Sequence, residues 1–118
     1  MSRPWSPAEA EAKLAHTLDE MGEAVTDLRE VAIAAAEAEH AFKLAEAREF
    51  ATLRSMGVPV GEASKTVMNN ESVAAKHLEH VLTEAVAKAS YKRVDVLKSQ
   101  SDGIRSVVGA ARGEIGWA

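Results

Sequence analysis

The stretch Met56-Gly57-Val58-Pro59-Val60-Gly61 decides the fold, because it interrupts a chain that otherwise reads as long, alanine-rich helix. Gly57 can adopt the left-handed conformation that commonly ends a helix. Pro59 has no N–H and disfavours the helical conformation at Val58. The first helix is therefore predicted to end near Met56, and this segment is predicted to act as a hinge.

Helix-start patterns lie on both sides of the hinge. Ser6 is a good N-cap with Pro7 at the first helical position, and Glu9 completes a capping box. Asn69-Asn70 offers a second start, with Glu71 in the first turn. We expect one domain with an arm and cap at 1–6, a helix at 7–56, a hinge with a short helix at 57–69, a second long helix at 70–112 and a tail at 113–118.

The spacing of apolar residues predicts that the two long helices pair. Along the first helix the steps alternate between four and three, which is typical of a coiled-coil seam, through Leu14, Leu18, Met21, Val25, Leu28, Ala32 and Ala35. A similar series follows on the second helix through Val67, Ala74, Leu78, Val81, Ala85, Ala89, Val94, Leu97, Ile104, Val108 and Ala111. In residues 1–40 acidic side chains outnumber basic ones, and the last third of the chain is rich in Lys and Arg. Antiparallel pairing would place these acidic and basic stretches side by side, so the charges favour it. The predicted fold is an all-α, coiled-coil-like antiparallel helical hairpin, with Trp5 and Trp117 at the same end.

Composition indicates a thin core. Of the 118 residues 47% are apolar, but about one in five is Ala and only 4% are aromatic. The segment 31–36 is apolar around most of the helix, which favours a second subunit or a third packed segment. We expect a homo-oligomer, and the predicted partner or oligomer surface comprises Val31, Ile33, Phe42, Phe50, Val81, Leu82 and Val86.

Charge and residue usage bound the cellular setting. The chain has no Cys, so a disulfide or thiolate metal site is excluded. The net charge of −4 argues against general binding to nucleic acid or to an anionic membrane. No apolar run approaches the roughly 20 residues that span a bilayer, and no apolar stretch follows Arg3 near the start. We expect a location in the cytoplasm, with no membrane partner.

A group of basic residues on the second helix gives an alternative interpretation as a nucleic-acid contact; it comprises Lys88, Lys92, Arg93, Lys98 and Arg105. Asp95, Asp102 and Glu114 are interleaved with these bases and would stand close to a bound phosphate backbone. Charge complementarity within the hairpin and a solvated face are therefore the favoured explanation.

The sequence lacks the patterns of a catalytic or metal site. His77 and His80 stand three apart, with Glu39 and His40 on the other helix, but the Glu-x-x-His pattern of di-metal bundles occurs only once, at Glu37 and His40. The serines have no Gly-rich elbow, and the hinge has no phosphate-binding Gly-Lys-Ser/Thr run. We predict a non-enzymatic protein with no metal or cofactor.

Two stretches, 38–48 and 97–106, carry a resemblance to a known group of proteins. With the Gly/Pro hinge between them, they resemble the small all-helical proteins of tailed phages of actinobacteria and other Gram-positive hosts, over roughly residues 30–114. The positions that match the second-helix pattern of these proteins are Tyr91, Arg93, Leu97, Ser99, Arg105, Ser106 and Arg112, while Phe42 stands where a Tyr is usual. Some such proteins are encoded among replication and recombination genes, so the resemblance implies a helper or adaptor role.

These observations together predict a phage-type adaptor or scaffold that binds another protein through an apolar helical face. Two alternatives stay open. One is a nucleic-acid accessory protein for phage replication or recombination that uses the basic second helix, and the other is a virion or assembly component. The host cytoplasm is the expected location for the adaptor and for the nucleic-acid accessory protein, and the virion is the expected location for an assembly component.

Overall fold

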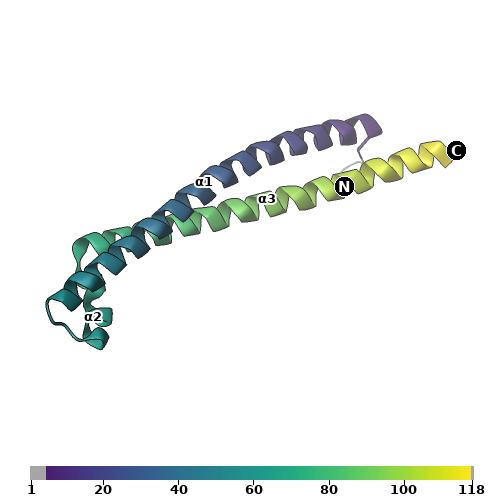
Figure 1. Ribbon diagram of the computed structural model, residues 1–118. Coiled ribbons are helices and arrows are strands. Elements are labelled where there is room, and N and C mark those ends of the chain that lie inside the picture. The colour runs from purple at the N-terminus through teal and green to yellow at the C-terminus, as the bar shows by residue number, and fades with distance from the viewer. Residues whose placement is uncertain (1–4, 118) are drawn as a thin grey trace. The chain divides into compact units, whose positions relative to one another are not determined.

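The fold is all-α in this computed structural model, which describes the backbone of residues 5–117 and the side chains of residues 5–110. In the described chain, α1 (Pro7–Ser55) leads through α2 (Val60–Thr66) and the 3-10 helix η1 (Val67–Asn69) to α3 (Glu71–Trp117) (Figure 1). The two long helices contain 49 and 47 residues. The predicted all-α helical hairpin is therefore confirmed.

The hinge ends α1 with a Schellman motif. Gly57 has a φ of 87°, the left-handed conformation that a side chain disfavours. Its N–H donates to the Arg54 carbonyl at 3.0 Å, and the Val58 N–H donates to the Leu53 carbonyl at 3.0 Å, so the last carbonyls of the helix are satisfied. Pro59 then precedes α2 with a φ of −59° and a ψ of 151°.

Side-chain caps begin both long helices at the predicted places. The Glu9 N–H donates to Ser6 Oγ at 3.1 Å. The Val73 N–H donates to Asn70 Oδ1 at 3.1 Å, while Asn70 Nδ2 donates to Glu49 Oε2 on α1 at 3.0 Å. Asn70 therefore caps α3 and also ties its start to α1.

The end of α3 differs from the predicted one. The helix runs to Trp117 instead of ending at residue 112, so helix replaces the expected tail through residue 117. Glycines in this part of the chain lower helix stability by about 1 kcal/mol each relative to Ala, but they do not block the helix as Pro would. The side chain of Trp117 lies outside the described residues, so its expected position near Trp5 stays a prediction.

The chain forms two compact units, although we expected a single domain. The terminal unit combines Met1–Leu28 with Ala89–Ala118, and the hinge unit is Arg29–Lys88. In each of them a stretch of α1 runs alongside a stretch of α3 in the opposite direction (Figure 1). Each unit is described by itself below.

A small apolar cluster and an ion pair hold the terminal unit together. Ala10, Ile104 and Val108 form a buried cluster against which Leu14 packs. Farther along, Arg93 Nη1 donates to Asp27 Oδ2 at 3.2 Å, which joins α3 to α1. This pair agrees with the charge complementarity expected between the two helices, although both side chains are about half exposed and such a pair contributes little stability.

The seam on α1 is partly different from the predicted one. Leu18 and Val25 are 38% and 41% exposed and Ala32 is exposed as well, so the assignment of these three residues to the seam is wrong. The inward positions alternate by four and three through Ala10, Leu14, Thr17, Met21, Ala24, Leu28, Val31, Ala35 and Ala38, all buried or half-buried. Small residues recur in this seam, which permits close approach of the two helices. The larger residues Leu18 and Val25 stand one position away, beside the contact.

The seam on α3 is predicted only in part in each unit. Ala74 of the hinge unit is half-buried as predicted, whereas Ala85 of the hinge unit and Ala89 of the terminal unit are exposed, and the side chain of Ala111 lies outside the described residues. In the terminal unit Leu97, Ile104 and Val108 are buried and Val94 is half-buried, as their spacing predicts. In the hinge unit Leu78 and Val81 are 58% and 46% exposed, so their predicted place in the seam is wrong. The half-buried positions on that stretch of α3 include His77, His80, Thr83 and Ala87 instead.

Candidate functional site

The face of α3 that meets α1 in the hinge unit combines the buried Val73 with the half-buried polar residues His77, His80 and Thr83. The Phe42 ring packs edge-on against His77, with ring centres 4.9 Å apart, and stacks on His80 at 5.8 Å. The Nδ1 atom of His80 is buried without a hydrogen-bond partner in the structure. An unpaired buried polar atom costs about 1–3 kcal/mol, so this contact stabilises the hinge unit less than an apolar seam would.

The opposite side of the same stretch of α3 is apolar and exposed. His80 stacks on Phe42 of α1, so its position marks the side of α3 that faces α1. A residue two positions from His80 lies about 200° around the axis of α3 from it. Leu78 and Leu82 therefore lie on the side of α3 away from its contact with Phe42, and Val86 continues their row one turn later. Their exposed fractions are 58%, 56% and 52%. We call Leu78, Leu82 and Val86 the α3 ridge; Val81, 46% exposed, lies at its edge.

An apolar groove runs beside the α3 ridge, still within the hinge unit. Val31 and Ala34 of α1 form one wall, and Leu82, Thr83 and Val86 of α3 form the other. Its volume is about 160 Å³, and none of its lining residues is charged. Ridge and groove together form a continuous apolar surface across two helices, a shape that accepts the apolar face of another helix.

Covering the α3 ridge would release appreciable free energy. Full burial of one Leu or Val side chain contributes about 1.5–3 kcal/mol, so three side chains that are each about half exposed retain about 2.5–5 kcal/mol in total. Contiguous exposed apolar patches of this kind mark interaction sites more often than isolated exposed residues do. The surface is therefore suited to binding a protein.

The structure brings together only part of the predicted partner surface. Val31, Leu82 and Val86 meet at the groove, whereas Val81 is 46% exposed and does not line it. Ile33 is 54% exposed but does not line the groove. Phe42 is half-buried against His77 and His80, and Phe50 lines a separate hollow at the hinge.

Sequence reasoning missed Leu78, Ala34 and Thr83 as members of this surface. Leu78 looked like a seam residue, because its spacing fits an inward stripe as well as an outward one. The pattern that distinguishes the two is the polar series His77, His80 and Thr83, whose spacing of three fits one helix face. That series meets α1 through Phe42, and the more apolar face is the one left exposed.

The predicted nucleic-acid residues are split between the units, and three of the five stand next to carboxylates. Lys88 of the hinge unit lies 3.0 Å from Glu84. In the terminal unit Arg93 pairs with Asp27 at 3.2 Å, and Arg105 lies 4.0 Å from Asp102. Lys92 and Lys98 are exposed in the terminal unit. Each neighbouring carboxylate would have to be displaced, or tolerated, when a phosphate binds.

The pKa of the Glu84 carboxyl is lowered by its neighbours. The Lys88 ammonium holds the pKa of the Glu84 carboxyl below its ordinary value of 4.5, first through a hydrogen bond and then through its charge, and His80 adds a smaller electrostatic effect. His80 Nε2 lies 3.5 Å from Glu84 Oε2.

The histidines are not gathered into a metal centre in the described part of the chain. No group of three or more His, Asp or Glu side chains there is placed to hold a metal ion. His40 is exposed on α1, while His77 and His80 face Phe42. The arrangement of His77 and His80 is one of ring packing between two helices.

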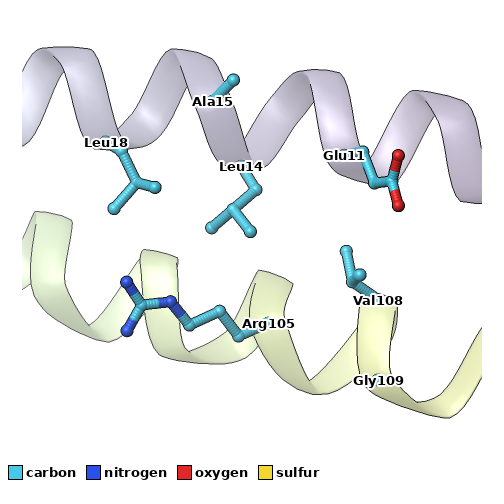
Figure 2. Close-up of a pocket in the computed structure, with 7 residues that line it drawn as sticks. All are labelled: Glu11, Leu14, Ala15, Leu18, Arg105, Val108 and Gly109. Carbon is cyan, nitrogen blue, oxygen red and sulfur yellow. The ribbon is translucent and has the colours of Figure 1, made fainter. Parts of the chain in front are cut away.

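A second hollow lies in the terminal unit, between the start of α1 and the late part of α3 (Figure 2). Its volume is about 470 Å³, and Leu14, Leu18 and Val108 give it an apolar floor. The charged residues Glu11 and Arg105 also line it (Figure 2). Because of these charges, it is less suited to an apolar helix than the groove of the hinge unit.

Comparison of the chain with protein-family models, curated proteins and solved structures finds no match. None of the helices in the described residues is long and apolar enough to cross a membrane. The geometry of the hinge unit therefore carries the functional argument.

Proposed function

We propose that this chain is a non-enzymatic adaptor or scaffold module that binds a protein through the apolar surface of its hinge unit. The observation that carries the proposal is the exposed aliphatic row on α3 opposite its contact with Phe42. The side of α3 with His77 and His80 meets Phe42 of α1, while Leu78, Leu82 and Val86 face outward and are more than half exposed. A helix that leaves its more apolar face uncovered is suited to a further packing partner.

The resemblance to small helical phage proteins adds a setting to this proposal. An adaptor of that kind would act in the cytoplasm of the bacterial host, or in the virion if it serves assembly. In either setting the same apolar surface makes the contact, and a homo-oligomer is one form that the contact can take.

A photo-crosslinking amino acid at position 86 tests the proposal in bacterial cells that express the chain. We expect covalent adducts between position 86 and protein, identified by mass spectrometry. His40 is exposed on α1 and does not line the groove, so the same crosslinker at position 40 is the matched control. Equal protein adducts at the two positions, or none at position 86, would contradict the proposal.

A mass measurement separates this function from the nucleic-acid alternative. Light scattering over a dilution series is run with and without a short DNA at low salt. We expect no gain in mass with DNA, because the bases at Lys88, Arg93 and Arg105 already have acidic neighbours. A monomer that gains mass only with DNA would instead favour an accessory protein that binds nucleic acid through α3.

A further inference from the structure

A separate hollow beside the hinge combines a carboxylate, an aromatic ring and a hydroxyl. Glu46, Ala47 and Phe50 of α1 line one side of it, and Ser64 of α2 and Val67 of η1 line the other. Its volume is about 310 Å³, at the lower end of the range of about 300–1,000 Å³ that small-molecule sites occupy. The hollow lies within the hinge unit and shares no lining residue with the groove beside the α3 ridge, so it is a second, independent site.

The Glu46 carboxylate in this hollow lacks a cation. Glu46 is half-buried, and it has no hydrogen-bond or ion-pair partner among the described side chains. The neighbouring bases of α1 are engaged elsewhere, because Lys43 pairs with Glu39 at 3.0 Å and Arg54 donates to a hinge carbonyl at 2.8 Å. Lys65 of α2 is exposed and does not line the hollow. A carboxylate that loses part of its hydration without gaining a protein partner favours a cation from outside the chain.

The other lining residues define the kind of cation. Phe50 lies one helical turn after Glu46 on the same side of α1, and an aromatic ring attracts an ammonium group. Val67, only 4% exposed, and Ala47 offer apolar surface for a short alkyl chain. The Ser64 hydroxyl has no hydrogen bond in the described part of the chain and can accept one from an N–H group. One carboxylate and one hydroxyl are too few ligands for a bound metal ion, which takes about six oxygens as Mg²⁺ or Ca²⁺.

We infer that the hinge hollow binds a primary ammonium group carried on a short aliphatic chain. The Glu46 carboxylate accepts a hydrogen bond from the ammonium group and balances its charge, Phe50 packs beside it, and Val67 contacts the alkyl chain. Free aliphatic amines and the lysine side chain of another protein share this chemistry. The inference does not depend on the proposed function, since the two surfaces have no residue in common.

A titration of the whole chain with n-butylammonium chloride tests the inference. Binding is followed by NMR through the Ser64 amide and Val67 methyl signals, at an ionic strength held constant with NaCl. We expect saturable shifts with a Kd of about 1–10 mM, because a ligand of about five non-hydrogen atoms makes few contacts. The matched neutral probe is 1-butanol, which has the same chain without the charge, and it should bind at least about tenfold more weakly.

Three variants separate the contributions of the lining residues. Glu46→Gln keeps the shape of the side chain and should weaken butylammonium binding about tenfold, through loss of a hydrogen bond to a charged acceptor. Phe50→Leu should weaken it about threefold. The control is Glu62→Gln, which removes an exposed carboxylate of α2 that does not line the hollow, and it should change Kd less than about twofold. Circular dichroism checks the helicity of each variant, and if Phe50→Leu does not fold, Glu46→Gln still decides the question.

The source of the ammonium group is identified by a second titration, with lysine whose backbone is capped as N-acetyl and N-methylamide. Tighter binding than that of butylammonium would identify a lysine side chain as the natural ligand, and weaker binding a free amine; both agree with the inference. Equal shifts from butylammonium and 1-butanol, an unchanged Kd in Glu46→Gln, or no shift at Ser64 and Val67 would each overturn it. None of these results alters the crosslinking expected at position 86, so the proposed function stands or fails separately.

Discussion

Asn70 is expected to contribute more stability than any other polar residue near the hinge, because it performs two tasks. Its Oδ1 accepts from the Val73 N–H at 3.1 Å and caps α3, and its Nδ2 donates to Glu49 of α1 at 3.0 Å. An N-cap contributes about 1 kcal/mol, and a hydrogen bond to a charged group contributes about 1.5 kcal/mol at the low end of its range. Asn70→Ala should therefore lower the free energy of unfolding by about 2.5 kcal/mol.

The effect is large enough to measure by thermal unfolding. For a chain of 118 residues, about 1 kcal/mol corresponds to a shift of about 4 °C in Tm, so Asn70→Ala should lower Tm by about 10 °C. Asn70→Asp separates the two tasks. The carboxylate retains the cap at the start of α3, but it removes the donor and faces Glu49. We expect it to lose the interhelical part alone, about 1.5 kcal/mol or slightly more.

Glu49→Gln in the Asn70→Asp background supplies the decisive control. The Gln amide can donate to the new carboxylate, so the bond forms again with donor and acceptor exchanged. A double-mutant cycle should give a coupling of about 1–2 kcal/mol between the two positions. If Glu49→Gln fails to rescue Asn70→Asp, the bond between α1 and α3 contributes nothing. If Asn70→Asp is as damaging as Asn70→Ala, the cap is the part that has no effect.

The remaining predictions concern backbone conformation, a buried hydroxyl and a titrating carboxyl. Gly103→Ala should raise the free energy of unfolding by about 1 kcal/mol, because Ala favours the helix and the added methyl meets nothing within 4 Å. Gly57→Ala should lower the free energy of unfolding by about 1–2 kcal/mol, because Gly57 has a φ of 87° that a side chain disfavours. Chemical denaturation measures both changes. Ser101 is 1% exposed and its Oγ has no partner, so Ser101→Ala should raise Tm by a few degrees, and a fall would show that the hydroxyl is bonded. The NMR titration midpoint of the Glu84 carboxyl should lie below 4.5 and should rise toward that value in Lys88→Gln. Because its folded pKa is lowered, the stability that Glu84 contributes is present above about pH 4.5 and is lost as the pH falls through the folded pKa.

The hinge and the helix starts could be predicted from the sequence because they depend on local chemistry. Gly57 and Pro59 end a helix through backbone geometry, and the Asn70 side chain reaches an N–H only three residues away. Such effects do not require knowledge of what packs on the helix. The end of α3 was less predictable, since Gly113 lowers helix propensity without blocking the helix as Pro would.

The packing faces could be predicted only in part, because both helices carry two apolar stripes. On α1 the stripe through Leu18 and Val25 is larger and more hydrophobic than the one through Thr17 and Ala24, and yet the second is buried. A periodicity of three and four identifies a seam but cannot choose between two seams one residue apart. The choice depends on how closely the two backbones approach, and small side chains permit the closer approach.

The partner surface follows from the same choice between seams. Once His80 stacks on Phe42, the helical period forces Leu78 and Leu82 to the outside. Beside the buried Ala38, Val67 and Val73, the hinge unit therefore half-buries His80 with an unpaired Nδ1 atom, and it exposes an aliphatic row on α3. Two-helix pairs draw most of their stability from the apolar face that they bury, so the unit gains stability from whatever covers that exposed row. Binding that occurs only in the folded state adds to the stability of that state by mass action. Folding of the hinge unit and occupation of the α3 ridge are for this reason expected to be thermodynamically coupled, and the polar contacts on the inner side keep the aliphatic side available for a partner.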